Sequence, residues 1–536
     1  MYFSRVREAL DSRDLDALAD LFDALWYELP ARFSSEVVAA TATLTKRDFD
    51  RQPRLFHLVY LSYHQHEWAG HDLGLRKFLQ FFLDQGCWYS KRLASFSRPE
   101  DLSTAATIAV ISARLRGALR ESQEIGRMAD SRIATHAGHF LRWNGEDTGG
   151  KPGWLSMQRG LSATLAGQID SAVSLYVRAH TESGPPPYGH FAGANAAANL
   201  ALLAAYQGHL GTAQHWRDQL DRMGPVMDWV EHLTTLGAKI AGALIALAEG
   251  DDDRAARCLK EAGPAATPGI ELWPFIAYTQ ATYDIAVGDA DRGLARLDET
   301  LFAHGASRPV PAAMTGRLLL QARAKLLVAA NQGHQVLDLV RQNPSAPEIR
   351  PAVAWVHHLA GHHHQAIRTA AKALQWPELS VDDRVEMHLV TALSHQEAGD
   401  LTRAGAAFMA AMGARSSPDH VRPFLRAPTE KISALAALTE IQDPLGVRPI
   451  SAEPLALGPI KIVRLTDRET AVLQELSNGL TAEKTAQRLG VAVSTVRTQI
   501  RSIYRKLGVS RRDEALARAQ ELRLLPTPGS TGAANH

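Results

Sequence analysis

Residues 494–507 read STVRTQIRSIYRKL and have the pattern of a helix with two chemically different sides. At 100° per residue, four aliphatic side chains fall within about 60° of one another and form one apolar stripe: Val496, Ile500, Ile503 and Leu507. The opposite side carries hydroxyl and guanidinium groups, on Ser494, Arg497, Thr498, Arg501 and Arg505. The segment holds four basic residues, Lys506 included, and no acidic one. We predict a helix that is buried along its stripe and polar on its free side.

Two shorter helices are predicted in front of this segment. Thr466 and Glu469 form a capping-box pattern, in which the Thr hydroxyl caps the third helical amide and the Glu reaches back. That helix ends at residues 478–479, and Thr481 caps a second helix that ends at Gly490. The positions of the two helices that face inward are Val472, Leu473, Leu476, Ala482, Thr485, Ala486 and Leu489.

A fourth helix is predicted at about residues 512–522. It presents one row of apolar side chains, on Ala515, Leu516, Ala519 and Leu522. This row either completes the core of a small helical domain or forms a seam between two copies of it. The sequence alone leaves both alternatives open.

A short helix, a tight turn and a helix with one polar side can dock in the major groove of DNA. Arginines on that side can bind phosphates or the edge of guanine, and Ser and Thr hydroxyls can donate to phosphates. The predicted DNA-contacting residues are Ser494, Thr495, Arg497, Thr498, Arg501 and Arg505. The alternative is that these arginines form an ordinary solvated helix face.

The residues of this region resemble, in order, the DNA-binding domain of the bacterial LuxR/response-regulator family. The resemblance rests on Leu465-Thr466, Arg468-Glu469, Val472-Leu473, Gly479, Ala486, Leu489, Thr495-Val496-Arg497, Ile503, residues 506–509, Arg512 and Ala515. It implies that the third helix reads the groove, with Arg497, Thr498 and Arg501 at the usual contact positions and Thr495 nearby. It also implies that the fourth helix mediates dimerisation on an inverted repeat.

Four positions depart from the family pattern. Ala492 stands where a Ser or Thr usually caps the third helix, and we expect Ser494 to take over that role. Gln499 occupies a common His position. Glu483 and Lys484 reverse the usual Lys-Glu order, which argues against a phosphate contact from the second helix.

The charge of the chain is unevenly distributed, although its formal net charge is only +1. Residues 461–525 contain 13 Lys and Arg against 7 Asp and Glu, a net charge of +6. The remainder carries 45 basic and 50 acidic residues, a net charge of −5. A compact basic end on an otherwise acidic chain is typical of a nucleic-acid-binding module joined to another domain.

A repeat precedes this module. Five glycines are each followed five residues later by an alanine. The five pairs are Gly167 with Ala172, Gly208 with Ala213, Gly250 with Ala255, Gly361 with Ala366 and Gly399 with Ala404. Two weaker copies of the pattern are Gly288 with Gly293 and Asn331 with Val336. Gly and Asn tolerate the left-handed backbone that ends a helix, and a small residue lets the returning helix pack closely. The spacing, between 30 and 43 residues, is that of helical-hairpin solenoids.

The repeat pattern resembles tetratricopeptide repeats over about residues 155–415. We therefore predict an all-α protein, a tetratricopeptide-like helical-hairpin solenoid followed by a four-helix LuxR-type helix-turn-helix domain. The expected boundaries are a degenerate helical region at 1–150, the solenoid at 151–441, a linker with four prolines at 442–463, the DNA-binding domain at 464–525 and a disordered tail at 526–536.

Composition is that of a soluble globular protein, with 46% hydrophobic and 21% charged residues. Cys87 and Cys258 are the only cysteines, too far apart in sequence for a disulfide framework or a zinc motif. The start of the chain shows no signal-peptide pattern, and the longest apolar stretch, residues 240–248, is short for a membrane span. A cytoplasmic protein is expected.

Three segments resemble catalytic or metal-binding motifs without fulfilling them. Residues 145–151 approximate a phosphate-binding loop, but Pro152 stands where a Ser or Thr is needed. His66 and His71 are five residues apart, which places them about 140° apart on a helix. The five histidines within residues 357–364 surround a turn, and a solvated cluster is the default interpretation, with metal or pH sensing as the alternative. We expect no enzyme activity, no cofactor and no metal.

The sequence thus predicts a sequence-specific DNA-binding transcription regulator that acts as a homodimer on duplex DNA. RNA polymerase is an expected partner, and the repeat region is expected to sense an unidentified small molecule or protein. A different class remains open: a repeat scaffold for protein interactions whose C-terminal helices serve only for dimerisation. A degenerate ATPase-type regulator is the third alternative.

Overall fold

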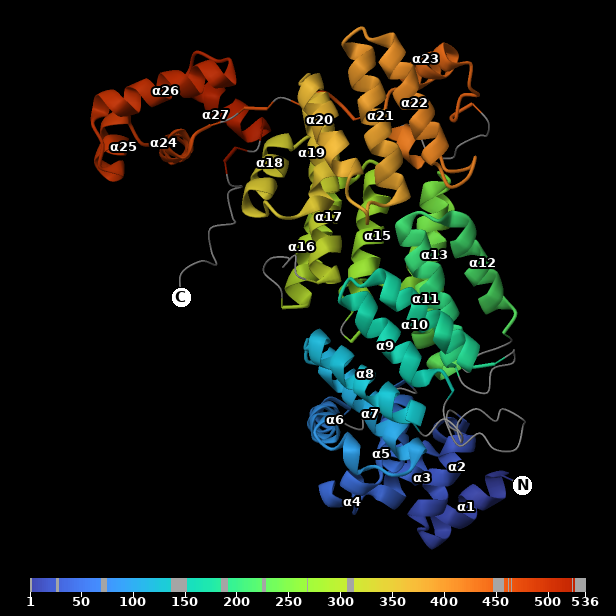
Figure 1. Ribbon diagram of the computed structural model, residues 1–536. Coiled ribbons are helices and arrows are strands. Elements are labelled where there is room, and N and C mark those ends of the chain that lie inside the picture. The colour runs from blue at the N-terminus through green and yellow to red at the C-terminus, as the bar shows by residue number, and fades with distance from the viewer. Residues whose placement is uncertain are drawn as a thin grey trace. The chain divides into compact units, whose positions relative to one another are not determined.

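Figure 1 presents a computed structural model of the chain, which describes residues 2–25, 28–68, 75–135, 152–184, 191–223, 228–267, 269–305, 313–446, 457–460, 462–463, 465–522 and 524–525. These residues form 27 α-helices and three short 3-10 helices, with no strand among them. The prediction of an all-α fold is confirmed.

The helices of the chain divide between two compact units, of which the first comprises Met1–Ala246, Arg254–Ile276 and Ala312–Gly316 and the second comprises Leu247–Asp253, Ala277–Pro311 and Arg317–His536. In chain order the first fifteen helices are α1 (Tyr2–Ser12), α2 (Leu15–Ala24), α3 (Glu28–Thr41), α4 (Lys46–Arg51), α5 (Pro53–Trp68), α6 (Leu75–Ser90), α7 (Pro99–Leu115), α8 (Leu119–Thr135), α9 (Trp154–Leu165), α10 (Ile169–Glu182), α11 (Ala192–Gln207), α12 (Leu210–Asp221), α13 (Asp228–Ala248), α14 (Asp252–Ala262) and α15 (Trp273–Ala286).

The remaining helices are α16 (Ala290–Ala303), α17 (Met314–Ala329), α18 (Gly333–Gln342), α19 (Arg350–Leu359), α20 (His363–Leu374), α21 (Val381–Glu397), α22 (Leu401–Ala414), α23 (Thr429–Thr439), α24 (Asp467–Ser477), α25 (Ala482–Leu489), α26 (Val493–Leu507) and α27 (Arg512–Glu521). The 3-10 helices are η1 (Leu93–Ser95), η2 (Pro347–Ile349) and η3 (Arg422–Arg426).

Every turn predicted by the repeat is a left-handed turn between two helices. The backbone φ angle is positive at each of them, at Gly167, Gly208, Gly250, Gly288, Asn331, Gly361 and Gly399. The residue five positions later is buried in all seven cases, at Ala172, Ala213, Ala255, Gly293, Val336, Ala366 and Ala404. Helical hairpins therefore run from α9/α10 to α21/α22. Their relationship to tetratricopeptide repeats stays a prediction.

Two further hairpins follow the same geometry without an alanine: α1/α2, which turns at Arg13 and has Leu18 five positions later, and α7/α8. Gly117 between α7 and α8 has a φ of 76°, and the residue five positions later is Ser122. This fully buried Ser donates to the Val110 carbonyl at 2.9 Å and lies 2.8 Å from the Ser162 hydroxyl. Because hydrogen bonds offset the burial of its hydroxyl, Ser takes the place of Ala at this crossing.

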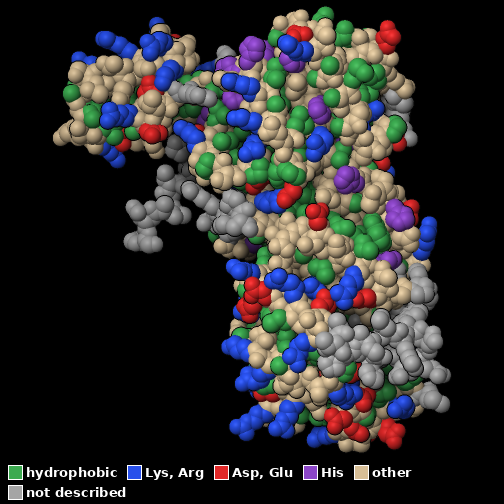
Figure 2. Space-filling model, viewed as in Figure 1, with side chains coloured by type: hydrophobic (Ala, Val, Ile, Leu, Met, Phe, Trp, Pro, Cys, Tyr) green, Lys and Arg blue, Asp and Glu red, His purple; other side chains and the backbone are tan. Residues whose placement is uncertain are grey.

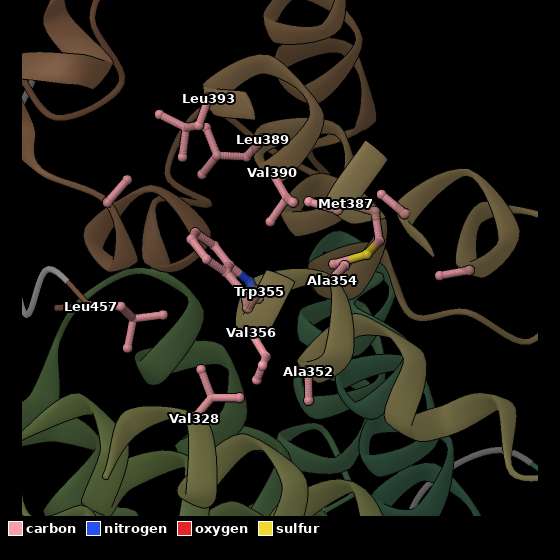
Figure 3. Packing of buried hydrophobic residues seen from close by; sticks show 14 of the residues in the cluster. Val328, Ala352, Ala354, Trp355, Val356, Met387, Leu389, Val390, Leu393 and Leu457 are labelled. Carbon is pink, nitrogen blue, oxygen red and sulfur yellow. The ribbon is translucent and has the colours of Figure 1, made fainter. Parts of the chain in front are cut away.

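The core of the second unit is built around Trp355 of α19. Figure 3 shows this side chain between Leu457 and Val390, with Val356 on the same helix nearby. Its indole N–H donates to Glu386 at 2.9 Å, and Glu386 also accepts two hydrogen bonds from Arg426 of η3. The indole therefore contributes a large apolar area while its one polar group is paired.

The described end of the predicted linker packs against the hairpins of this unit. Leu457 and Ile460 belong to the same apolar cluster as Trp355, and both are buried. The Leu457 amide donates to the Arg426 carbonyl and the Ile460 amide to the Leu359 carbonyl, each at 3.0 Å. A Cβ on Gly333 would lie 2.5 Å from the Ile460 side chain. Residues 457–460 are thus docked on the hairpins, although the four prolines predict a semi-rigid, extended connector.

Ile460→Ala should weaken this docking, because it removes most of a buried side chain. We expect a loss of about 2–4 kcal/mol of local stability. Amide hydrogen exchange of the full chain, followed by mass spectrometry, should show faster exchange at residues 457–460 and in α19. Ile462→Ala is the control, since Ile462 is only partly buried against the same cluster. Equal effects of the two changes would show that residue 460 is no anchor.

The apolar stretch at residues 240–248 lies in a longer helix. By length and composition α13, with 21 residues, is the one described helix that could cross a membrane. The structure buries 61% of its most apolar window, which is also the behaviour of a core helix. Several predictions lie outside the described residues: the loop-like segment 145–151, the His66 and His71 side chains, Pro449 and Pro454 of the linker, and the tail at 526–536.

Candidate nucleic-acid interface

Helices α24 to α27 pack into one small module with a shared apolar core. Its buried members come from all four helices: Val472, Leu473, Leu476, Ala486, Val496, Ile503, Leu507, Ala515 and Ala519. Four helices with so few buried large side chains form a small core, so each cap and each ion pair matters more for stability than in a large domain.

The predicted start and stop signals of the first two helices are present. Thr466 Oγ1 accepts from the Glu469 amide at 3.2 Å, and the Thr466 amide donates to Glu469 Oε2 at 2.7 Å. The Thr481 hydroxyl accepts from the Lys484 amide at 3.4 Å, and Gly490 ends α25 with a φ of 64°. The turn into α26 is therefore specified by residues that the sequence reveals directly.

Helix α26 has the two sides that its sequence predicts, with one difference. Val496, Ile503 and Leu507 are buried, whereas Ile500 is only half-buried. All six predicted contact residues are exposed: Ser494, Thr495, Arg497, Thr498, Arg501 and Arg505. Figure 2 shows Lys and Arg side chains spread over the module, at the upper left of the view. The exposed side of α26 is thus hydroxyl-rich and basic.

The basic residues of α26 differ in their partners. Arg497 Nη2 lies 2.7 Å from Glu483 Oε1 of α25, and Lys506 Nζ lies 2.6 Å from Glu469 Oε2 of α24. The Arg501 and Arg505 side chains form no ion pair with any described residue. The guanidinium groups of Arg501 and Arg505 can therefore bind an anion without first breaking an ion pair, whereas Arg497 already lies beside a carboxylate.

Glu469 has a second role that the sequence did not reveal. Besides its capping contact it accepts from the Ser502 hydroxyl at 2.7 Å and from Lys506, so it joins the start of α24 to the last turns of α26. Burial alone would raise the pKa of Glu469, but the hydrogen bonds from Lys506, Thr466 and Ser502 lower that pKa to about 2. The spacing of Ser502 and Lys506, four residues apart on one helix side, is the signal that points to this contact.

The expected cap of α26 is absent. The helix begins at Val493, with Ala492 as its N-cap residue and no side-chain hydrogen bond to the first turn. Ser494 lies one residue inside the helix and is exposed, so the prediction that it caps α26 is wrong. An N-cap oxygen must come from the residue before the helix, where φ and ψ are extended.

Ala492→Ser should therefore stabilise the beginning of α26, because its backbone already has the extended N-cap conformation, with φ −69° and ψ 146°. We expect a gain of about 0.5–2 kcal/mol. In the full chain this corresponds to about 2- to 30-fold slower amide exchange in the first turn of α26. Ala482→Ser, inside α25, supplies no cap and should leave that exchange unchanged. Unaltered exchange in the Ala492 variant would contradict the prediction.

The apolar row of α27 is divided between core and surface. Ala515 and Ala519 are fully buried inside the module, so they are core residues and cannot line a seam between two copies in this arrangement. Leu516 and Leu522 are partly buried at the edge of the same core. Dimerisation through α27 stays a prediction, and of the four residues only these two leucines retain exposed surface for it.

The histidine cluster does not form a metal site in the described part of the chain, where no three His, Cys, Asp or Glu side chains are grouped to hold an ion. His357 and His358 are buried at the end of α19, and His358 Nδ1 lies 2.9 Å from the Ser394 hydroxyl. Burial, together with the nearby His363 and Lys431, lowers the pKa of His358 to about 4. His358 is thus a buried, neutral residue of the α19/α21 interface.

Comparison with known proteins gives the module a family. Residues 463–519 match the family described as bacterial regulatory proteins, luxR family. The HTH-type transcriptional regulator MalT of Yersinia pestis (strain Pestoides F) is 38% identical over 80 residues, which cover 15% of this chain and 9% of that protein. MalT of Serratia proteamaculans (strain 568) is 43% identical over 63 residues, 12% of this chain and 7% of that protein. The matched segment thus spans less than a tenth of these relatives. The predicted resemblance of the C-terminal module is confirmed.

Proposed function

We propose that this chain, whose C-terminal module is a luxR-type helix-turn-helix domain, is a transcription regulator that binds duplex DNA in a sequence-specific manner. The observation that carries the proposal is the exposed side of α26, where three arginines and three hydroxyl residues stand opposite a buried aliphatic stripe. In this proposal α26 enters the major groove while α24 and α25 hold its other side.

The six exposed residues have different roles in this proposal. Arg497 and Thr498 lie on one turn of the exposed side and Arg501 lies on the next, and all three reach base edges or the phosphates beside them. Ser494 and Thr495 lie near the helix N-terminus, where hydroxyls and free amides suit a phosphate. Arg505, one turn further on, binds the backbone. Two copies on an inverted repeat would join through the exposed parts of Leu516 and Leu522.

The helical repeats supply the input in this proposal. Stacked hairpins present long concave surfaces to ligands, so a small molecule or a protein bound there would alter the exposure or oligomeric state of the module. RNA polymerase is the proposed downstream partner, and the bacterial cytoplasm the proposed location. No catalytic step is assigned to the chain. The proposed domain boundaries remain those predicted from the sequence.

The experiment that tests DNA binding is the genome-wide recovery of DNA bound to the full chain in its native cell. We expect enrichment at a limited set of promoters that share a two-fold-symmetric motif. The purified chain should then bind a duplex carrying that motif more tightly than a scrambled duplex of the same composition. A scaffold that uses its C-terminal helices only for dimerisation would recover no motif and would not distinguish the two duplexes.

A nucleotide-dependent regulator is the other alternative to test. Equilibrium binding of ATP to the full chain and to Lys151→Ala addresses it directly, because Lys151 is the only lysine of the loop-like segment. We expect no ATP binding by either chain. Saturable binding that the substitution abolishes would show that the segment at 145–151 holds a nucleotide.

A further inference from the structure

The ion pair between Glu483 and Arg497 joins the second helix of the module to the recognition side of the third. The two residues are 14 positions apart, and their side chains meet across the turn between α25 and α26 at 2.7 Å. Both are well exposed, with 58% of the Glu483 and 62% of the Arg497 side chain accessible. An exposed ion pair of this kind contributes little to the stability of the fold. Its contribution to folding therefore does not account for its presence.

The pair is the one carboxylate contact on the exposed basic side of α26 among the described residues. Arg501 and Arg505 on the same side form no ion pair there, and Glu469 contacts Lys506 at the margin of the core instead. Hydrogen bonds from its own backbone amide and from Arg497 lower the pKa of Glu483. An ionised carboxylate therefore lies beside an arginine on the surface that would approach a polyanion.

Resting on the proposed function, we propose that Glu483 is a positioning residue that holds Arg497 for contact with a base edge and withholds it from phosphates, and so increases sequence discrimination. A guanidinium already held in one orientation loses less freedom when it forms two parallel hydrogen bonds to guanine. A phosphate contact would instead require Arg497 to leave Glu483, which would then lack its counter-charge near the DNA backbone.

The energetic effect of the carboxylate differs between sequences. Repulsion between Glu483 and phosphates weakens binding to every duplex, specific or not. The orientation of Arg497 strengthens binding only where a guanine stands at the right position. Discrimination is the ratio of the two affinities. The repulsion common to every duplex leaves this ratio unchanged, whereas holding Arg497 for guanine and away from phosphates enlarges it.

The test compares Glu483→Gln with the wild-type full chain on two probes. The first is a duplex that the wild-type chain selects from a random-sequence pool, and the second is a scrambled duplex of the same length and composition. Glu483→Gln should bind the scrambled duplex more tightly, and the ratio of the two affinities should fall about fivefold or more. The salt dependence on the scrambled duplex should steepen by about one ion, because Arg497 becomes free to bind a phosphate.

Two controls separate positioning from bulk charge. Asp513→Asn removes one negative charge from an exposed site on α27, and should raise both affinities slightly without changing their ratio. In an Arg497→Ala background, Glu483→Gln should no longer affect the ratio. Selection repeated with the Glu483→Gln chain should lose the guanine preference at one position of each half-site and keep the preferences at the other positions. A general loss of folding stability would not produce such a position-specific change.

The outcomes distinguish this inference from the proposed function. If the wild-type chain selects a motif and Glu483→Gln selects the same motif with an unchanged affinity ratio, Glu483 has no positioning role while DNA binding stands. If the two variants Glu483→Gln and Asp513→Asn shift binding alike, the carboxylate acts only through net charge and the inference is wrong. If the wild-type chain binds no duplex at low salt, the proposed function fails and this inference fails with it.

Discussion

Replacing both Arg497 and Arg501 with alanine should abolish selective DNA binding while leaving the fold intact. Both side chains are exposed on one side of α26 and neither contributes to the module core. Each lost base contact should cost about 1–3 kcal/mol, and each lost phosphate contact should reduce the salt slope by about one. Fluorescence anisotropy of a labelled duplex, titrated with the full chain at several salt concentrations, measures both quantities.

A charge-matched variant separates these contacts from general electrostatics. Arg292→Ala with Arg403→Ala removes two exposed arginines of the repeat region, each of which forms an ion pair with a neighbouring Asp on its own turn. We expect this variant to bind DNA as the wild-type chain does, with the same salt slope. If the α26 variant bound its selected duplex as tightly as this control, α26 would not be the recognition helix.

The repeat could be predicted well because its signals are local. Left-handed turns require Gly or Asn almost irrespective of context, so seven of them were visible in the sequence. The Gly-to-Ala pattern does not include the turns at Gly117 and Arg13, because the residue five positions later is Ser122 in one case and Leu18 in the other. Both residues are buried like the alanines, but the pattern sought a small apolar side chain.

Contacts that depend on tertiary structure were not visible. The sequence of α27 shows an apolar row, but a row that fills a core and a row that pairs two copies look the same. Only the fold places Ala515 and Ala519 inside the module. In the linker the prolines dominated the interpretation, although Leu457 and Ile460 stand among them and proved to be core residues.

The candidate site contains features that follow from the local sequence and features that depend on tertiary structure. The exposed side of α26 followed from helical periodicity, because a helix with one apolar stripe has only one way to bury it. Helical periodicity does not predict the ion-pair partners of Lys506 and Arg497, because Glu469 and Glu483 are on other helices and more than ten residues away. Ion pairing therefore divides a set of basic residues that the sequence presents as equivalent.

Glu469→Gln should strongly destabilise the module. The carboxylate caps α24 and at the same time holds Ser502 and Lys506, with only 5% of the residue exposed. A neutral amide leaves the Lys506 ammonium without its counter-charge and supplies fewer acceptors. From the lowered pKa we expect a loss on the order of 3 kcal/mol at neutral pH. That loss should accelerate amide exchange in α24 and α26 by about 100-fold.

The low pKa of Glu469 also predicts how the stability of the module responds to acid. Glu469 has a pKa of about 2 in the folded chain, below its ordinary value of 4.5, so its contribution is fully present above pH 4.5. It declines as the pH falls toward 2, because the unfolded chain then binds the proton more readily than the folded one. About half should be gone by pH 3. After correction for intrinsic exchange rates, the difference between wild type and Glu469→Gln in α24 and α26 should shrink accordingly. Asp513→Asn, an exposed change of equal charge, should show no such convergence, and a difference constant between pH 7 and pH 3 would show that Glu469 acts through shape and not through its charge.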